Sequence, residues 1–132
     1  MITEDYVSFE VAKLLKEKGF NEPTFTYYNN NGELMNSCHF CGNYTLGCFN
    51  VVKDEKVNCA APTHQMVMKW LREVHRIIII IQKEVYTGSG NWWCRIDRSD
   101  RPYIDSIESD ADYESYELAA EAAILYCLEN LI

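Results

Sequence analysis

Basic residues are scarce in this chain. Its 132 residues include 12 Lys and Arg against 20 Asp and Glu, which gives a formal net charge of −8. A protein of this charge repels phosphate backbones, so nucleic acid is disfavoured as a binding partner. Hydrophobic residues nevertheless make up 48% of the chain, which is enough to build a folded core.

The sequence also lacks a long hydrophobic segment. The isoleucine run Ile77–Ile81 is far too short to span a bilayer, and Met1–Asp5 has neither the basic nor the apolar region of a signal peptide. These absences predict a cytoplasmic protein with no membrane partner. In the cytoplasm the six cysteines stay reduced, so they are either buried small side chains or metal ligands.

Familiar catalytic motifs are missing as well. The chain contains no GxSxG, no HExxH, no P-loop and no glycine-rich dinucleotide turn. A Cys–His nucleophile pair can in principle be assembled from distant positions, but nothing in one sequence selects the cysteine. We therefore predict a protein that is not an enzyme and has no catalytic residue.

What the sequence does contain is a helix that runs directly into a strand. Ala61–His75 carries apolar residues at helical spacing, with Pro62 suited to the first turn, and Ile77–Ile81 follows almost at once. β-Branched residues favour extended backbone, and a run that is apolar on both faces calls for cover on both faces. We expect Ile77–Ile81 to be a central strand packed under helices.

The residues before this stretch predict a helix and several strands. Phe9–Lys18 is amphipathic, with Ser8 placed to cap its start and Gly19 placed to end it. Residues rich in β-branched and aromatic side chains, separated by turn residues, predict strands in the next segment. The expected strands are Thr24–Tyr28 and Glu33–Met35, joined by a turn, then Tyr44–Val52 and a return strand near Val57.

The residues after the isoleucine run predict a hairpin and a last helix. A turn over Gly88–Asn91 leads into a strand over Trp92–Asp97, a polar loop covers Arg98–Tyr113, and the helix begins near Ser115. No linker or repeat divides the chain. We predict a single α+β domain over residues 1–132, with an antiparallel or mixed sheet packed by three helices in the order α-ββ(ββ)-α-ββ-α.

Three helical segments carry a family resemblance. They are Tyr6–Phe20, Ala61–His75 and Tyr113–Ile132, together about 50 of the 132 residues. In these segments the chain resembles small uncharacterised proteins of gut anaerobic bacteria and their phages or prophages, for which no activity is established. The resemblance implies an intracellular protein, phage-associated or carried by a mobile element, and it assigns no functional residue.

The sharpest local motif is a CxxC pair followed by glycine. Cys38 and Cys41 form this pair, and Cys48 and Cys59 follow at longer spacing. Thiolates are good zinc ligands, and a CxxC lets two sulfurs reach one ion. Because the second pair is not another CxxC and isolated cysteines are often simply buried, a zinc-stabilised binding module remains the alternative interpretation.

A second candidate site is aromatic. Alternation along the strand Trp92–Asp97 puts Trp92 and Trp93 on opposite faces. One tryptophan is then a core residue, while Trp93, beside Arg95 and Tyr86, can anchor a partner, since aromatic and Arg residues concentrate binding energy at interfaces. Core packing or a cation–π contact within the monomer is the competing interpretation. We predict a small accessory or protein-interaction protein that binds a protein partner or itself.

A third candidate is an acidic run near the C-terminus. The run contains no Lys or Arg, and such a surface can imitate DNA to block a nuclease. A charge run is more often a solvated face that keeps a protein soluble, so this DNA-mimic hypothesis ranks third. Its residues are Asp105, Glu108, Asp110, Asp112, Glu114, Glu117 and Glu121.

Overall fold

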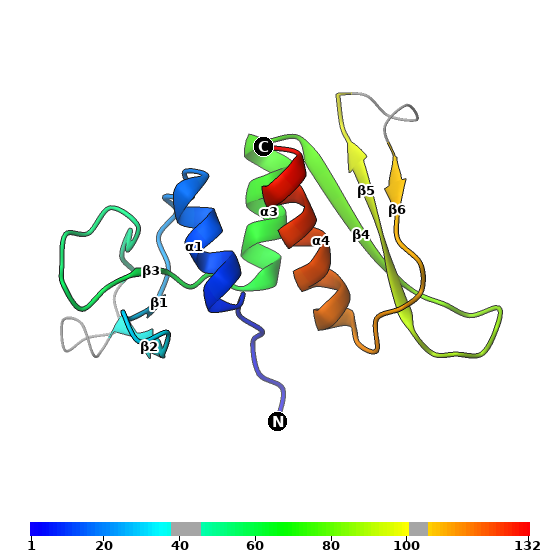
Figure 1. Ribbon diagram of the computed structural model, residues 1–132, viewed down its shortest axis with the longest axis horizontal. Helices are drawn as coiled ribbons and strands as arrows, with labels where there is room; N and C mark the ends of the chain where they lie inside the picture. The colour runs from blue at the N-terminus through cyan, green and yellow to red at the C-terminus, as the bar shows by residue number, and fades with distance from the viewer. Residues whose placement is uncertain (38–45, 101–105) are drawn as a thin grey trace. The chain divides into compact units, whose positions relative to one another are not determined.

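The computed structural model (Figure 1) describes residues 1–37, 46–100 and 106–132. The described residues form three helices and two three-stranded antiparallel sheets, so the predicted α+β class is confirmed. The chain divides into two compact units, Met1–Thr63 and His64–Ile132, which are described separately below. The single-domain organisation stays a prediction.

The first unit begins with helix α1, Phe9–Glu17. The Ser8 hydroxyl caps its start by accepting a hydrogen bond from a backbone N–H of the first turn. At its end Gly19 adopts a φ of +88°, and the Phe20 N–H donates to the Leu15 carbonyl at 2.9 Å. This is the glycine-based helix ending that the sequence predicts, and it buries Phe20 completely.

The sheet of the first unit has the strand order β2-β1-β3. Strand β1, Thr26–Tyr28, pairs antiparallel with β2, Leu34–Asn36, and with β3, Cys59–Ala60. The Asn29 side chain shapes the turn between β1 and β2, because it accepts backbone hydrogen bonds from Asn31 at 2.9 Å and Glu33 at 3.0 Å. The predicted hairpin is thereby confirmed.

Two details of the expected first half are wrong. Tyr44 and Thr45 lie outside the described residues, and the part of the expected strand from Leu46 to Val52 contains one isolated bridge, Gly47 to Thr24, and a turn. The Asn50 side chain lies in that turn and accepts from the Ala60 N–H at 2.8 Å, so a side chain makes the bond that a neighbouring strand would make. Pro62 precedes the next helix instead of opening it, because its carbonyl accepts the Val7 N–H.

The second unit starts with helix α3, His64–Val74, and continues into strand β4, Ile77–Lys83. Strand β4 pairs antiparallel with β5, Trp92–Arg98, as the hairpin prediction requires. The short strand β6, Ile107–Glu108, pairs with β5 in a segment expected to be loop. Helix α4, Tyr116–Asn130, begins after Ser115, whose hydroxyl accepts the Leu118 N–H at 3.1 Å.

Helices α3 and α4 cover one face of this sheet, and the core lies between them and the strands (Figure 1). Alternate strand residues point into it, and the small side chains of α4 let that helix approach closely. No helix in the described part of the chain is long and apolar enough to span a membrane. The buried residues of this core include Val67, Leu71, Ile77, Ile79, Cys94, Ile96, Ala119, Ala120, Ala123, Ile124, Cys127 and Leu128.

The isoleucine strand is not central. The sheet order is β4-β5-β6, which places β4 at the edge among the described strands, so the expectation of a central strand covered on both faces is wrong. Ile77 and Ile79 are core residues, whereas Ile78 and Ile80 are only half-buried on the other face. There each of them lies opposite a polar residue of β5, which gives partial cover without a second helix layer.

Candidate functional site

The sheet of the second unit has one face that none of the described helices covers. Strand pairing puts Ile80 opposite Arg95, Gln82 opposite Trp93, and Arg95 opposite Glu108, so these side chains share that face. All of them are at least partly exposed. We call this surface the open face; its residues are Ile78, Ile80, Gln82, Trp93, Arg95, Asp97 and Glu108.

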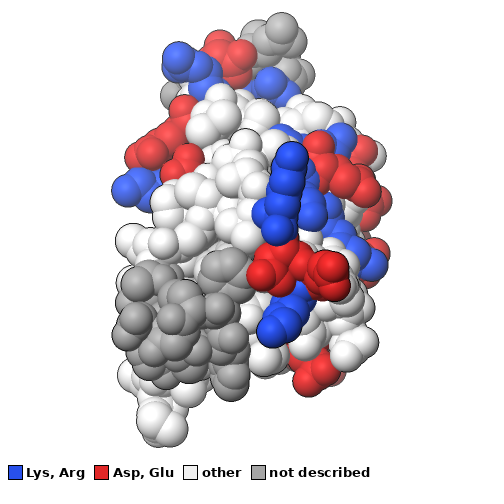
Figure 2. Space-filling view, turned by 90° about the vertical axis from the view of Figure 1, so that its left-hand side faces the viewer, with Lys and Arg blue, Asp and Glu red and all other residues white. Residues whose placement is uncertain are grey.

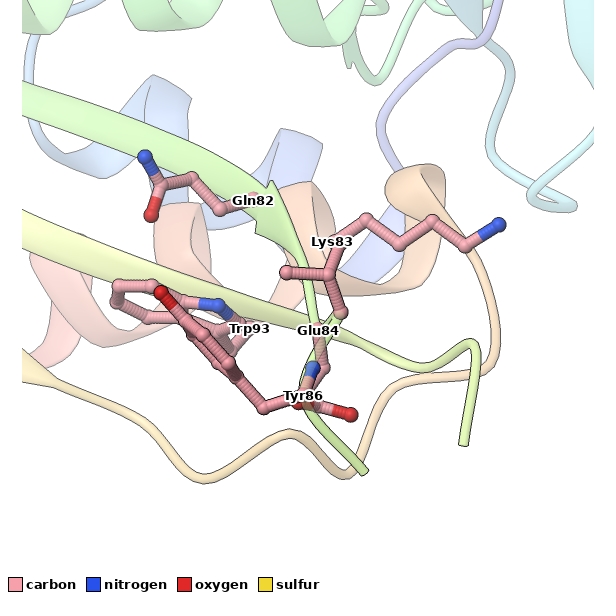
Figure 3. A pocket seen from close by; sticks show the side chains of 6 residues that line it. Gln82, Lys83, Glu84, Tyr86 and Trp93 are labelled. Carbon is pink, nitrogen blue, oxygen red and sulfur yellow. The ribbon is translucent and has the colours of Figure 1, made fainter. Parts of the chain in front are cut away.

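A cavity of about 510 Å³ lies where the open face meets the β4–β5 hairpin loop. Trp93 contributes to its wall from β5, and the Tyr86 side chain extends from the loop toward Trp93 (Figure 3). Tyr86 is 96% exposed and Val85 71% exposed, so the loop presents large apolar groups to solvent. The lining residues are Gln82, Lys83, Glu84, Val85, Tyr86 and Trp93.

The Glu84 carboxylate organises the loop that carries Tyr86. It accepts hydrogen bonds from the backbone N–H groups of Tyr86 and Thr87, from the Thr87 hydroxyl, and from Ser89 Oγ at 3.1 Å. These bonds, led by that of the Thr87 hydroxyl, lower the pKa of Glu84 to about 2. Gly88 and Gly90, both at φ +73°, supply the left-handed backbone that the turn requires. The Glu84 carboxylate thus fixes the loop backbone at Tyr86 and Thr87, and we call this set of hydrogen bonds the Glu84 brace.

The polar groups of the cavity wall are available to a ligand. Within the described residues, the Trp93 indole N–H, the Tyr86 hydroxyl and the Gln82 amide have no hydrogen-bond partner. Aromatic rings combined with free donors and acceptors suit the recognition of a side chain that has both apolar and polar parts. Among the described residues that line the cavity, no nucleophile is aligned with a base.

Arg95 pairs with Asp97 and does not contribute to the cavity wall. It lies on the same face of β5 as Trp93, but it does not line the cavity. Its Nε and Nη2 donate to Asp97 Oδ2 at 3.1 and 2.9 Å. The pKa of Asp97 is lowered, first by the hydrogen bond from Ser106 and then by Arg95. Of the three predicted partner-binding residues, the structure thus brings together Trp93 and Tyr86 and gives Arg95 a neighbouring ion pair.

Two of the four candidate zinc ligands lie among the described residues. Cys38 and Cys41 lie outside the described residues, while Cys48 and Cys59 are free thiols. Cys59 is completely buried, and burial raises its pKa to about 11 against the opposing effect of Lys16. Across the described ranges, no group of three or more His, Cys, Asp or Glu side chains is placed to hold a metal ion. The zinc module stays a prediction.

The acidic run does not form one uniform surface. Asp105 lies outside the described residues, Glu108 is on the open face, and Glu121 binds His64 at 2.6 Å. Asp110, Asp112, Glu114 and Glu117 are exposed around the start of α4. Figure 2 shows the left-hand side of the view in Figure 1, where Lys and Arg side chains lie beside Asp and Glu. The DNA-mimic hypothesis also stays a prediction.

Sequence reasoning missed the residues that shape the cavity floor and loop. Gln82, Lys83 and Glu84 carry no motif, and their roles depend on pairing with β5 and on the loop conformation. The available signal was local: an acidic residue followed by Thr87 and Ser89 can accept several short-range hydrogen bonds.

No family model, curated protein or solved structure matches the chain. The resemblance to proteins of gut anaerobes and their phages stays a prediction.

Proposed function

We propose that the chain is a non-enzymatic protein-interaction module that binds a protein partner at the cavity between Trp93 and Tyr86. The observation that carries this proposal is that Trp93, which is partly exposed, and Tyr86, which is fully exposed, line one cavity on a sheet face that none of the described helices covers. Aromatic side chains of this kind dominate the energetics of protein interfaces. The setting we infer is the cytoplasm, where the thiols of the described cysteines are stable.

The size and chemistry of the cavity favour one anchoring side chain of the partner. Its volume of about 510 Å³ falls in the range of sites that enclose a small group, so it can admit one large side chain together with water. The aromatic walls favour an apolar or aromatic anchor, and the Trp93 indole N–H and the Tyr86 hydroxyl can form hydrogen bonds with its polar end. The Glu84 brace fixes the backbone at Tyr86 and Thr87, which reduces the backbone entropy lost on binding.

Capture from a lysate of the source organism, followed by crosslinking of the full chain, tests the proposal. Trp93→Ala and Tyr86→Ala should each weaken recovery of the captured protein by about tenfold or more, as expected of anchor residues. Phe25→Ala is the matched control, because Phe25 is an aromatic residue that is 51% exposed in the other unit. Its binding should equal that of the unchanged chain.

Two results would overturn the proposal. In the first, Trp93→Ala binds normally and the crosslinks map away from the cavity. In the second, Trp93→Ala loses the cooperative unfolding transition, which would make Trp93 a core residue instead of a contact residue. Circular dichroism on each variant separates loss of binding from loss of fold.

A further inference from the structure

The outer edge of β4 pairs with none of the described strands. The Glu84 N–H donates to the Asn91 carbonyl at 2.8 Å, and the Ser99 N–H donates to the Arg76 carbonyl at 2.8 Å. In an antiparallel ladder, hydrogen-bonded positions alternate, so the even-numbered residues of β4 exchange their backbone bonds with β5. The N–H and C=O groups of Ile79 and Ile81 therefore point away from the sheet, and within the described chain they have no partner.

This edge has few of the features by which proteins protect such strands. Ile77 is completely buried, so the open part of the edge begins at Ile79; from there to Lys83 it includes no proline and no glycine, and the only charge is Lys83 at the far end. Ile80 and Ile81 are half-exposed beside the open backbone groups. An apolar edge of this kind readily accepts another strand, because both backbone pairing and side-chain burial are favourable.

From this edge we infer that the chain forms a dimer in which β4 pairs antiparallel with β4 of a second copy. A two-fold axis at Ile80 places Ile80 opposite its own counterpart, and Ile79 opposite Ile81 of the second copy. The outward backbone groups of Ile79 and Ile81 then bond to each other across the axis. The same isoleucines that are half-exposed in one copy cover one another in the pair.

The charges at the two ends of β4 favour the second copy as the occupant. Arg76 lies one residue before β4, at a φ of +58°; in the register centred on Ile80 this end of the strand meets the Glu84 end of the second copy, and the reverse contact forms by symmetry. Arg76 is exposed, with a guanidinium that has no partner among the described residues, while Glu84 is an anion fixed at the other end of the strand. An unrelated extended peptide would have to supply both the apolar run and the opposite charges, which β4 already contains.

The dimer edge and the partner cavity both include Glu84, but they depend on different groups, so the two proposals can fail separately. The cavity requires Trp93 and Tyr86, whereas the dimer requires the outward backbone of β4. Trp93→Ala should leave the dimer intact. A variant that breaks the dimer should still bind a partner at the cavity.

Sedimentation velocity of the full chain over a range of concentrations tests the dimer. Ile80→Lys brings two like charges face to face at the axis and should weaken the dimer by about a hundredfold. Gln82→Lys is the matched control, because it adds the same charge on the same face but opposite Ile78 of the second copy. Ile81→Pro removes an outward N–H without removing a bond to β5, and should also give a monomer.

Amide hydrogen exchange supplies a readout that a change in fold would not mimic. The amides of Ile79 and Ile81 should become protected as the concentration rises, while those of Ile80 and Gln82 are protected at every concentration. A monomer at millimolar concentration would overturn the inference. A dimer with unprotected Ile79 and Ile81 amides, or one that Ile80→Lys and Gln82→Lys affect equally, would also overturn it.

Discussion

His64 Nε2 lies 2.6 Å from Glu121 Oε2 and joins the first residue of α3 to the middle of α4. The two side chains are 7% and 24% exposed, so the contact is shielded from water. Beside it, Gln65 donates to the Tyr116 hydroxyl at 3.0 Å. Glu121 therefore belongs to the packing of the second unit, although by sequence it is one member of an acidic run.

Removal of the Glu121 carboxylate should destabilise the second unit. Glu121→Ala leaves a buried imidazole nitrogen without its partner, and we expect the free energy of unfolding to fall by about 1–3 kcal/mol. Glu121→Gln retains an acceptor for the histidine and should cost less. Urea denaturation followed by circular dichroism measures both changes.

Glu117 provides the control for this prediction. It is exposed one turn earlier on α4, and Glu117→Ala should change the free energy of unfolding by no more than about 0.5 kcal/mol. Equal losses for Glu117→Ala and Glu121→Ala would mean that general helix charge, and not the contact with His64, is the source of the effect.

Acid should release the loop that carries Tyr86. The pKa of Glu84 is lowered from 4.5 to about 2, first by the hydrogen bond from the Thr87 hydroxyl. A depressed carboxyl pKa stabilises the folded loop fully above pH 4.5, and this stabilisation is lost as the pH falls through about 2. The Glu84 carboxyl carbon, followed by NMR, should titrate in that range together with the Thr87 amide. A midpoint near 4.5 would show that the brace does not form.

The features predicted correctly from sequence are those set by neighbouring residues. The Ser8 and Ser115 caps, the Gly19 helix ending and the opposite faces of Trp92 and Trp93 all depend on local geometry or strict alternation. Each is visible within a few residues of chain.

The features missed depend on contacts between distant residues. His64 and Glu121 are 57 positions apart, and no periodicity indicates that they meet. The edge position of Ile77–Lys83 was missed because an apolar run has the same composition whether helices cover one face or two. Strand β6 contains only two residues, too few to show alternation. Likewise, the Trp93 side of the cavity was predictable, but its Gln82 and Glu84 contributions were not.

Metal removal should leave the stability of the chain unchanged. Burial raises the pKa of Cys59 to about 11, which opposes formation of a thiolate at this position. Thermal unfolding with and without a strong chelator, on protein purified without a metal-affinity step, measures the effect. Release of about one zinc per chain with a lower Tm would instead establish the zinc module at Cys38, Cys41, Cys48 and Cys59.

Truncation of the two adjacent tryptophans should lower the free energy of unfolding by very different amounts. Trp92 faces the helices and meets the Tyr116 ring edge-on at a centroid distance of 5.6 Å, whereas Trp93 lies on the open face. Trp92→Ala should lower the free energy of unfolding by about 2–4 kcal/mol, because it removes an aromatic contact between β5 and α4.

Trp93→Ala should change the same quantity by no more than about 1 kcal/mol, because a partly exposed ring on an uncovered face loses little packing. Chemical denaturation of the two variants under identical conditions measures the difference. If Trp93→Ala proves the more destabilising change, the strand has the opposite orientation and the cavity between Trp93 and Tyr86 cannot be the binding surface.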